Sequence, residues 1–325
     1  MQRRDILRAG LAIGGGAALP ALAQPANTTF IWSGFPAGGL GDQVTRPLLE
    51  QMRGKLPQNL VYDTKPGAGG RIAAEFVKRS TPDGNQIFQT PASVMVLQPH
   101  VFKKLPYDTL ADFTPIAGLC AFTTVLTAGP GLPADVRNVA DLLRWAKANP
   151  NAANIGNPSS GSGMHLASML LAKQSGAPLN PIPYKGGAPL LNDLMGGQIP
   201  VSINVISEVL PQIRAGKLRA LAVSAPTRSK ALPDVSTMTE QGFKELAYVE
   251  WLGWFGPAQM PPARVAALNA AVNEALATPA MAEALTKVGL EPLRATAAQF
   301  AAQVRQDHGY WAQVVKATGF QPEDA

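Results

Sequence analysis

The strongest constraint on the fold is a repeated alternation of short apolar runs, loops rich in glycine, proline and serine, and amphipathic segments. Residues 29–33 predict a strand, and loop 35–41 leads into a helix that Asp42 is expected to cap and that runs towards Lys55. Further strands are predicted at 60–63, 86–90, 153–156, 201–206 and 218–223, and further helices at 72–79, 139–148, 164–174, 262–277, 280–288 and 296–318. Such alternation is typical of an α/β protein with mainly parallel sheets flanked by helices.

Composition agrees with a folded protein of this class. The chain has 325 residues, of which 46% are hydrophobic and 15% charged, so it can bury a core. This length favours two sheets over one. No apolar run reaches the roughly 18–20 residues of a membrane-spanning helix. The basic residues are spread singly along the chain, so no nucleic-acid partner is expected.

Cysteine and histidine are too few for a metal centre. Cys120 is the single cysteine, which excludes an internal disulfide and a cysteine-rich metal site. None of the three histidines belongs to an H-x-x-x-H pair. We therefore expect no metal and no other cofactor.

The first 23 residues resemble an export signal. Arg3 and Arg4 precede a short glycine-rich apolar stretch at 9–19, and residues 21–23 form an A-x-A cleavage site. The alternative, an amphipathic helix, is disfavoured by the three glycines at 14–16. These features predict export by the twin-arginine route, cleavage after Ala23 and a periplasmic mature protein.

The loops 35–41 and 159–163 are the richest in glycine and serine, and each connects a predicted strand to a predicted helix. Ligands of open α/β sheets bind at such loops, beyond the carboxyl ends of the strands. Glycine allows backbone N–H groups to approach a ligand closely, and the helix N-terminus that follows presents unpaired donors. The pattern indicates an anion site; tight turns that only pack against their neighbours are the alternative.

These loops lack the spacing of the common phosphate and nucleophile motifs. No G-x-x-x-x-G-K-[ST] sequence occurs, and Ser162 does not belong to a G-x-S-x-G elbow. His165 follows Ser162 by three residues, which leaves an exported serine hydrolase as an alternative function. Lys185, in the turn 183–187, is either a contact for a ligand carboxylate or an ordinary surface lysine.

Several short motifs follow one another along the chain in a specific order and spacing. They are Phe35-Pro36 with Gly38-Gly39 and Asp42, PGAGG at 66–70, KLPYD at 104–108, DFTP at 112–115, PYKG at 183–186, GKLRALAV at 216–223 and LPDV at 232–235. Together they resemble the solute receptors of tripartite tricarboxylate transporters, often called Bug proteins. The resemblance runs from about Phe30 to Phe320.

The resemblance implies a two-domain periplasmic binding protein of the Venus flytrap type, whose chain crosses between the domains twice, near 120–128 and 246–256. Domain one would comprise 24–124 and 250–325, and domain two 125–249. Such receptors are not enzymes. They close on a small organic acid, a mono- or dicarboxylate that can be aromatic, and deliver it to an inner-membrane tripartite tricarboxylate transporter or report it to a sensor kinase.

The resemblance also implies which residues bind the ligand, through backbone N–H groups, hydroxyls and ordered water. By position they are Phe35, Gly38, Gly39, Gly41, Asp42, Thr90, Ser93, Ser160, Gly161, Ser162, His165 and Asn204. Lys185 completes the candidate set. Asn204 departs from the family pattern, where Asp is frequent, and so removes a negative charge near the expected cleft. An amino acid or another ammonium-bearing ligand is therefore less expected than a plain organic acid.

Overall fold

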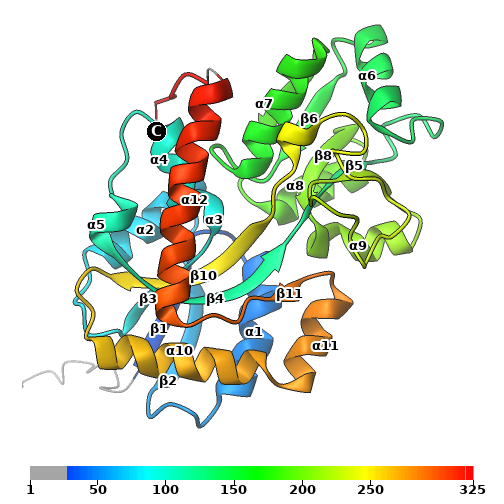
Figure 1. The fold of residues 1–325 in the computed structure, drawn as a ribbon. Helices are drawn as coiled ribbons and strands as arrows, with labels where there is room; N and C mark the ends of the chain where they lie inside the picture. Colours follow the sequence, from blue (N-terminus) through cyan, green and yellow to red (C-terminus); the bar gives the residue numbers. More distant parts are fainter. Residues whose placement is uncertain (1–27, 319, 325) are drawn as a thin grey trace, which may run out of the picture.

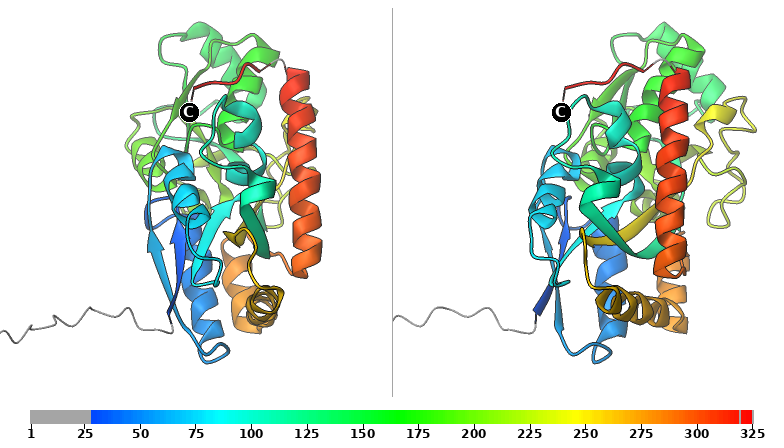
Figure 2. Two further views of the ribbon diagram at one scale, coloured as in Figure 1. Left: turned by 90° about the vertical axis from the view of Figure 1, so that its left-hand side faces the viewer. Right: turned by 60° about the vertical axis from the view of Figure 1, so that its left-hand side comes forward.

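The computed structural model describes residues 28–318 and 320–324, so the predicted export signal lies outside the described part of the chain. The strands form two separate sheets, one of six strands and one of five, with helices around both (Figures 1 and 2). This is the two-domain α/β architecture expected from the sequence. Among the described helices, none combines the length and the apolar character needed to cross a bilayer.

The larger sheet has the strand order β11-β4-β10-β3-β1-β2. Its β1 (Thr28–Ser33) pairs in parallel with β2 (Asn59–Thr64) and β3 (Gln86–Pro91). In contrast, β10 (Glu250–Pro257) runs antiparallel to β3 and β4 (Phe113–Phe122), and β11 (Glu291–Pro292) runs antiparallel to β4. The helices of this part are α1 (Leu40–Met52), the 3-10 turn η1 (Ala68–Gly70), α2 (Arg71–Lys78), α3 (Ala92–Val96), α4 (Gln98–Val101), α5 (Thr109–Asp112), α10 (Pro262–Leu276), α11 (Pro279–Lys287) and α12 (Ala297–Thr318).

The smaller sheet has the strand order β7-β6-β8-β5-β9. Its β6 (Asn154–Asn157) runs parallel to β7 (Asn180–Pro183) and β8 (Val201–Val205). At the other side, β5 (Thr124–Ala128) runs antiparallel to β8 and β9 (Arg219–Val223). The helices of this part are α6 (Val139–Ala148), α7 (Gly163–Ser175), α8 (Gly187–Met195) and α9 (Ile206–Arg214), and the 3-10 turn η2 (Lys244–Leu246) precedes the return to the larger sheet.

The chain passes between the two sheets twice. Only Thr123 separates β4 from β5, and the chain returns to the larger sheet at the start of β10. The strands β4, β5 and β10 run antiparallel to all their partners. The expectation of mainly parallel sheets is therefore corrected: both sheets are mixed. A strand that enters from the other sheet does not follow a helical crossover, so nothing constrains it to run parallel. The domain boundaries given above stay a prediction.

The core of the larger sheet is aromatic. Trp254 and Phe255 of β10 are fully buried, as is Phe300 of α12. The ring of Phe300 lies 5.5 Å from that of Phe255, and a Cβ on Gly253 would lie 2.4 Å from it, so Gly253 makes room for α12. After α12 the chain turns back (Figure 2). Glu323 there forms backbone hydrogen bonds with Val101, at the end of α4, and with Lys103.

Candidate ligand-binding site

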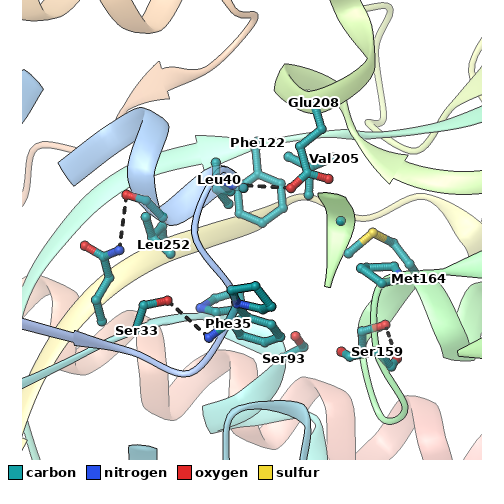
Figure 3. Close-up of a pocket in the computed structure, with 18 residues that line it drawn as sticks. Ser33, Phe35, Leu40, Ser93, Phe122, Ser159, Met164, Val205, Glu208 and Leu252 are labelled. Carbon is teal, nitrogen blue, oxygen red and sulfur yellow. Dashed lines mark hydrogen bonds between the residues drawn. The ribbon is translucent and has the colours of Figure 1, made fainter. Parts of the chain in front are cut away.

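A narrow cavity lies where the strand-to-helix loops of the two sheets meet (Figure 3). Its volume is about 60 Å³, several times the roughly 10–15 Å³ that one water molecule requires. Its polar lining side chains are Ser33, Gln89, Ser93, Ser159, Ser162 and Glu208. Its apolar lining side chains are Phe35, Pro36, Leu40, Pro91, Phe122, Pro158, Met164, Val205 and Leu252. Because both sheets contribute, the shape of the cavity depends on how the two sheets are placed.

The first turn of α1 presents backbone donors to this cavity. The helix begins after Gly39, and no side chain caps it. The N–H of Leu40 donates to Oε1 of Glu208 at 3.3 Å, whereas the N–H groups of Gly39 and Gly41 have no acceptor in the part of the chain that the structure describes. All three residues of the turn line the cavity. A helix N-terminus with unpaired N–H groups attracts anions.

Asp42 does not cap this helix, contrary to the prediction, because α1 begins at Leu40 and Asp42 is its third residue. The Asp42 carboxylate reaches back and accepts a hydrogen bond from the N–H of Gly38 at 3.0 Å. It also pairs with Arg46 at 2.7 Å. Asp42 therefore stabilises the loop before α1 through Gly38 and does not line the cavity.

Gln89 holds the α1 loop in place. A Cβ on Gly41 would lie 2.5 Å from the hydroxyl of Tyr62 and 3.0 Å from Nε2 of Gln89, so only glycine fits there. The buried Gln89 amide accepts hydrogen bonds from Thr45 and, at 3.0 Å, from Nε1 of Trp254. It donates to the carbonyl of Gly41 at 3.4 Å. This one side chain thus connects β3 to α1 and β10.

Glu208, in the first turn of α9, brings a carboxyl group into the cavity (Figure 3). Its Oε1 accepts the Leu40 N–H, while its Oε2 is buried and has no hydrogen-bond partner among the described residues. A Cβ on Gly187 would lie 2.1 Å from Oε2, so the carboxyl group also lies against the first residue of α8, another helix without a side-chain cap. Burial raises the pKa of Glu208 to about 7, although the Leu40 N–H opposes this effect.

The first turn of α7 is closed by its own side chains. Oγ of Ser162 accepts the N–H of His165 at 3.1 Å and donates to the carbonyl of Ser159 at 2.8 Å. Nδ1 of His165 accepts the N–H of Gly161 at 3.3 Å, and burial lowers the pKa of this ring. The Ser162 hydroxyl and the His165 ring therefore have separate partners and do not form the nucleophile–base pair of the hydrolase alternative.

The structure brings part of the predicted site together. The predicted residues that line the cavity are Phe35, Gly39, Gly41, Ser93 and Ser162. Those that do not line it are Gly38, Asp42, Thr90, Ser160, Gly161, His165, Lys185 and Asn204. Gln89, Gly187 and Glu208 are among the lining residues that the sequence analysis did not include in the candidate set.

Ser160 and the exposed Lys185 line a wider groove of about 560 Å³ beside the cavity. This outer groove also contains Arg71. Groove and cavity share three residues, Phe35, Pro36 and Ser159. Two basic side chains therefore lie at the approach to the cavity, although none lies in its lining.

The side chains of His165 and Asn204 lie outside both the cavity and the outer groove. His165 lies in a small pocket with Val101 and Phe320. Asn204 is buried in β8, where it accepts a hydrogen bond from Ser202. Side chains alternate between the faces of a strand, and the next residue, Val205, lines the cavity, so Asn204 points to the opposite face.

One signal could have revealed Glu208. It follows the end of β8 by three residues, and such strand-end positions are where α/β sheets bind ligands. Gly187 had a similar signal, because it ends the turn 183–187 that follows β7. Gln89 had none, since it lies within β3 and its partners are in distant elements. Among residues 28–318 and 320–324, no group of three or more His, Cys, Asp or Glu side chains is placed to hold a metal ion.

Known proteins share both the sequence pattern and the fold of this chain. Residues 44–320 match the tripartite tricarboxylate transporter family receptor. BugT of Bordetella pertussis is 33% identical over 286 residues, which cover 88% of this chain and 87% of BugT. The periplasmic binding protein BugD superposes with a TM-score of 0.85 at 32% identity, over 92% of this chain and 100% of BugD. MatC from Rhodopseudomonas palustris, solved with bound malate, has a TM-score of 0.83 at 28% identity, over 90% of this chain and 99% of MatC. The chain therefore belongs to the tripartite tricarboxylate transporter receptor family, whose members are periplasmic solute-binding proteins.

Proposed function

We propose that this receptor captures a small organic anion with a carboxylate group in the cavity between its two sheets. The observation that carries this function is the first turn of α1, where Gly39 and Gly41 line the cavity and their N–H groups have no acceptor among the described residues. The helix has 13 residues, and the positive end of its dipole adds to these two donors. A carboxylate oxygen is the kind of acceptor that such a pair of N–H groups holds.

The walls of the cavity suit the rest of such a ligand. The hydroxyl of Ser159 offers a further hydrogen bond, and Phe122, Met164 and Leu252 offer apolar contacts to a carbon skeleton. MatC, a relative of the same fold that was solved with malate, supports an organic acid as the ligand class.

The outer groove is the proposed entrance. Arg71 and Lys185 place positive charge there, and such charge raises the rate at which anions arrive. Once inside, the ligand contacts residues of both sheets. Those contacts exist together only when the sheets are close, so the ligand stabilises the closed arrangement.

We also propose the domain bounds, the export route, the absence of a cofactor and the partners that the sequence predicted. Domain one comprises 24–124 and 250–325, and domain two 125–249; the division of the strands between two sheets supports these bounds. The protein is exported by the twin-arginine route, is cleaved after Ala23 and works without a cofactor. It delivers its ligand to an inner-membrane tripartite tricarboxylate transporter or reports it to a sensor kinase.

A thermal-shift screen tests the proposed ligand class. The purified protein is unfolded and refolded to remove bound ligand, and is then mixed with succinate, malate, adipate or benzoate. A ligand with a Kd of about 1 µM adds about 4 kcal/mol of stability at about 1 mM. In a protein of this size that raises the Tm by several degrees.

The control is the amide of each acid, which keeps the carbon skeleton and lacks the negative charge. We expect a shift with at least one acid and none with its amide. Equal shifts with acid and amide, or no shift with any acid, would contradict the proposed function.

A further inference from the structure

The cavity proposed for an anion contains a carboxyl group of its own. Neither Lys nor Arg is among the described residues that line it, so Glu208 is the lining side chain that can carry a charge. A Cβ on Gly39 would lie 3.1 Å from Oε1 of Glu208. Gly39 therefore lies against this carboxyl group, and an anion held in the same cavity by the first turn of α1 would share it with Glu208. Two carboxylates so close together disfavour each other's ionised form, the more so because Oε2 of Glu208 is buried.

We propose that Glu208 is a ligand-binding residue that takes up one proton when the anion binds and donates it in a hydrogen bond to the ligand carboxylate. This inference rests on the proposed function. Oε1 already accepts the Leu40 N–H, whereas Oε2 is buried and has no partner among the described residues, so Oε2 carries the proton. The proton comes from solvent and leaves again with the ligand.

The same geometry narrows the ligand class. An ammonium group beside the ligand carboxylate would pair with ionised Glu208, and no proton would then be needed. An organic acid without such a group needs the proton. Glu208 therefore selects plain and hydroxylated acids over amino acids when it is protonated.

No charged group on the described elements around Glu208 is placed to neutralise its carboxylate in place of this proton. On the α1 side, Asp42 and Arg46 pair with each other. On the α8 side, Lys185 is exposed and Asp193 accepts a hydrogen bond from Tyr184. The strands β5 and β8, which pack against α9, contain no titratable residue, and β10 begins with the buried Glu250. Burial and the Leu40 N–H are the causes that set the pKa of Glu208 near 7, so an anion beside it raises this pKa further.

Isothermal titration calorimetry of the refolded protein tests the inference directly. Succinate, malate and adipate are titrated between pH 5.5 and 8.5, and aspartate serves as the ammonium-bearing probe. At pH 8 each titration is repeated in phosphate and in Tris, whose ionisation enthalpies differ. The difference in measured heat gives the number of protons taken up per ligand.

For any plain acid that binds, we expect uptake approaching one proton at pH 8 and a Kd that rises about tenfold for each pH unit above the pKa of Glu208. Glu208→Gln cannot ionise and keeps a hydrogen-bond donor. Its affinity should stay within about threefold of the wild-type value at pH 6 and should no longer depend on pH. Glu250→Gln is the matched control: it removes another carboxyl group whose pKa is raised by burial but which does not line the cavity, and it should keep both the proton uptake and the pH dependence.

Three outcomes would overturn the inference. Binding of a plain acid without proton uptake would do so, as would the same pH dependence in Glu208→Gln as in the wild type. Tighter binding of aspartate than of succinate and malate, lost in Glu208→Gln, would show instead that ionised Glu208 pairs with an ammonium group. If none of the acids binds at any pH, the proposed function itself fails, and this inference fails with it.

Discussion

Two carboxyl groups lie beside helix N-termini in different surroundings: that of Glu208, a half-buried residue whose Oε2 is buried, and that of the buried Glu250. Glu208 lies against the first residues of α1 and α8, which have no side-chain caps, and it lines the cavity. Glu250 lies against Gly163, the first residue of α7, where a Cβ would be 2.4 Å from its Oε1. Ser162 caps that helix. Burial raises the pKa of both carboxyl groups to about 7.

The comparison shows that capping decides what a helix N-terminus can do. The uncapped end of α1 keeps backbone donors available to a ligand, whereas the Ser162 hydroxyl uses a donor of α7 within the protein. Similar glycine- and serine-rich loops thus precede the uncapped helix end that we propose to bind the ligand and a helix end that its own serine closes. We expect Glu208 to affect ligand binding and Glu250, which is 2% exposed, to affect stability alone.

The largest effect is expected from Glu250→Gln. Because the native protein holds the Glu250 proton up to about pH 7 and the unfolded chain releases it near pH 4.5, the wild type loses stability as the pH rises between these values. The variant avoids this loss and should gain up to about 3 kcal/mol at pH 8. Urea denaturation from pH 4.5 to 8 measures the difference between variant and wild type.

Glu245→Gln is the control, since Glu245 is exposed. The difference in unfolding free energy between Glu245→Gln and the wild type should stay the same over this pH range. A pH-independent difference for Glu250→Gln as well would show that Glu250 is not buried as the structure places it.

The next largest effect is expected at the uncapped end of α1. Gly39→Pro removes the N–H proposed for the ligand, and proline tolerates the φ of −88° at this position. Because hydrogen bonds to charged groups contribute about 1.5–3 kcal/mol, the affinity for the bound acid should fall about 10- to 100-fold. Titration calorimetry measures this.

Gly39→Ala is the matched control, because it adds the same Cβ and keeps the N–H. Its affinity should lie well above that of Gly39→Pro. If the two variants bind equally, the Gly39 N–H does not hold the ligand.

At the capped end of α7 we expect a loss of stability without a loss of binding. Ser162→Ala removes the cap and should cost about 1 kcal/mol, a fall in Tm of about 2–4 °C. Differential scanning calorimetry measures this fall, and Ser162→Thr, which keeps a capping hydroxyl, should show less of it. A tenfold loss of affinity in Ser162→Ala would mean that α7 binds the ligand as α1 does.

The smallest effect is expected from Asp42→Ala, which frees the loop before α1 without touching the cavity. The variant loses the hydrogen bond from the Gly38 N–H to Asp42, which contributes about 1 kcal/mol to the order of the loop. The affinity should therefore fall a few-fold. Asp42→Asn keeps an acceptor and should bind like the wild type. Equal losses in both variants would show that the charge of Asp42, rather than its hydrogen bond, supports the loop.

Helices with clear apolar spacing and a polar cap were predictable. The predicted bounds 139–148 coincide with α6, which Asn138 caps through the N–H of Asp141 at 2.9 Å. In contrast, α8 begins after Gly186 without a side-chain cap, and the sequence analysis did not predict it. The strands β4 and β5 were also missed. In β5 every residue is buried, so its sequence shows no alternation of polar and apolar residues.

The candidate site was predictable where glycine marked it. Phe35, Gly39 and Gly41 lie in a loop whose composition alone indicated an anion site. Glu208 and Gln89 were not predictable in this way. The partner of Glu208 is Leu40, 168 positions away, and a partner of Gln89 is Trp254, 165 positions away. Gln89 has no local feature that distinguishes it from an ordinary polar residue, and Glu208 has only its position just after the end of β8.

The sequence by itself determined the α/β class, the family and the loop whose backbone faces the cavity. These follow from short-range features: apolar periodicity, glycines that permit close backbone approach, and motifs in a given order. Only the tertiary structure decided which helix end is open, which strands run antiparallel and which carboxyl group lines the cavity. Those properties depend on contacts between residues far apart in the chain, and on the burial that such contacts produce. Burial is what moves the pKa of Glu208 to about 7, so the charge of the site is a property of the folded protein.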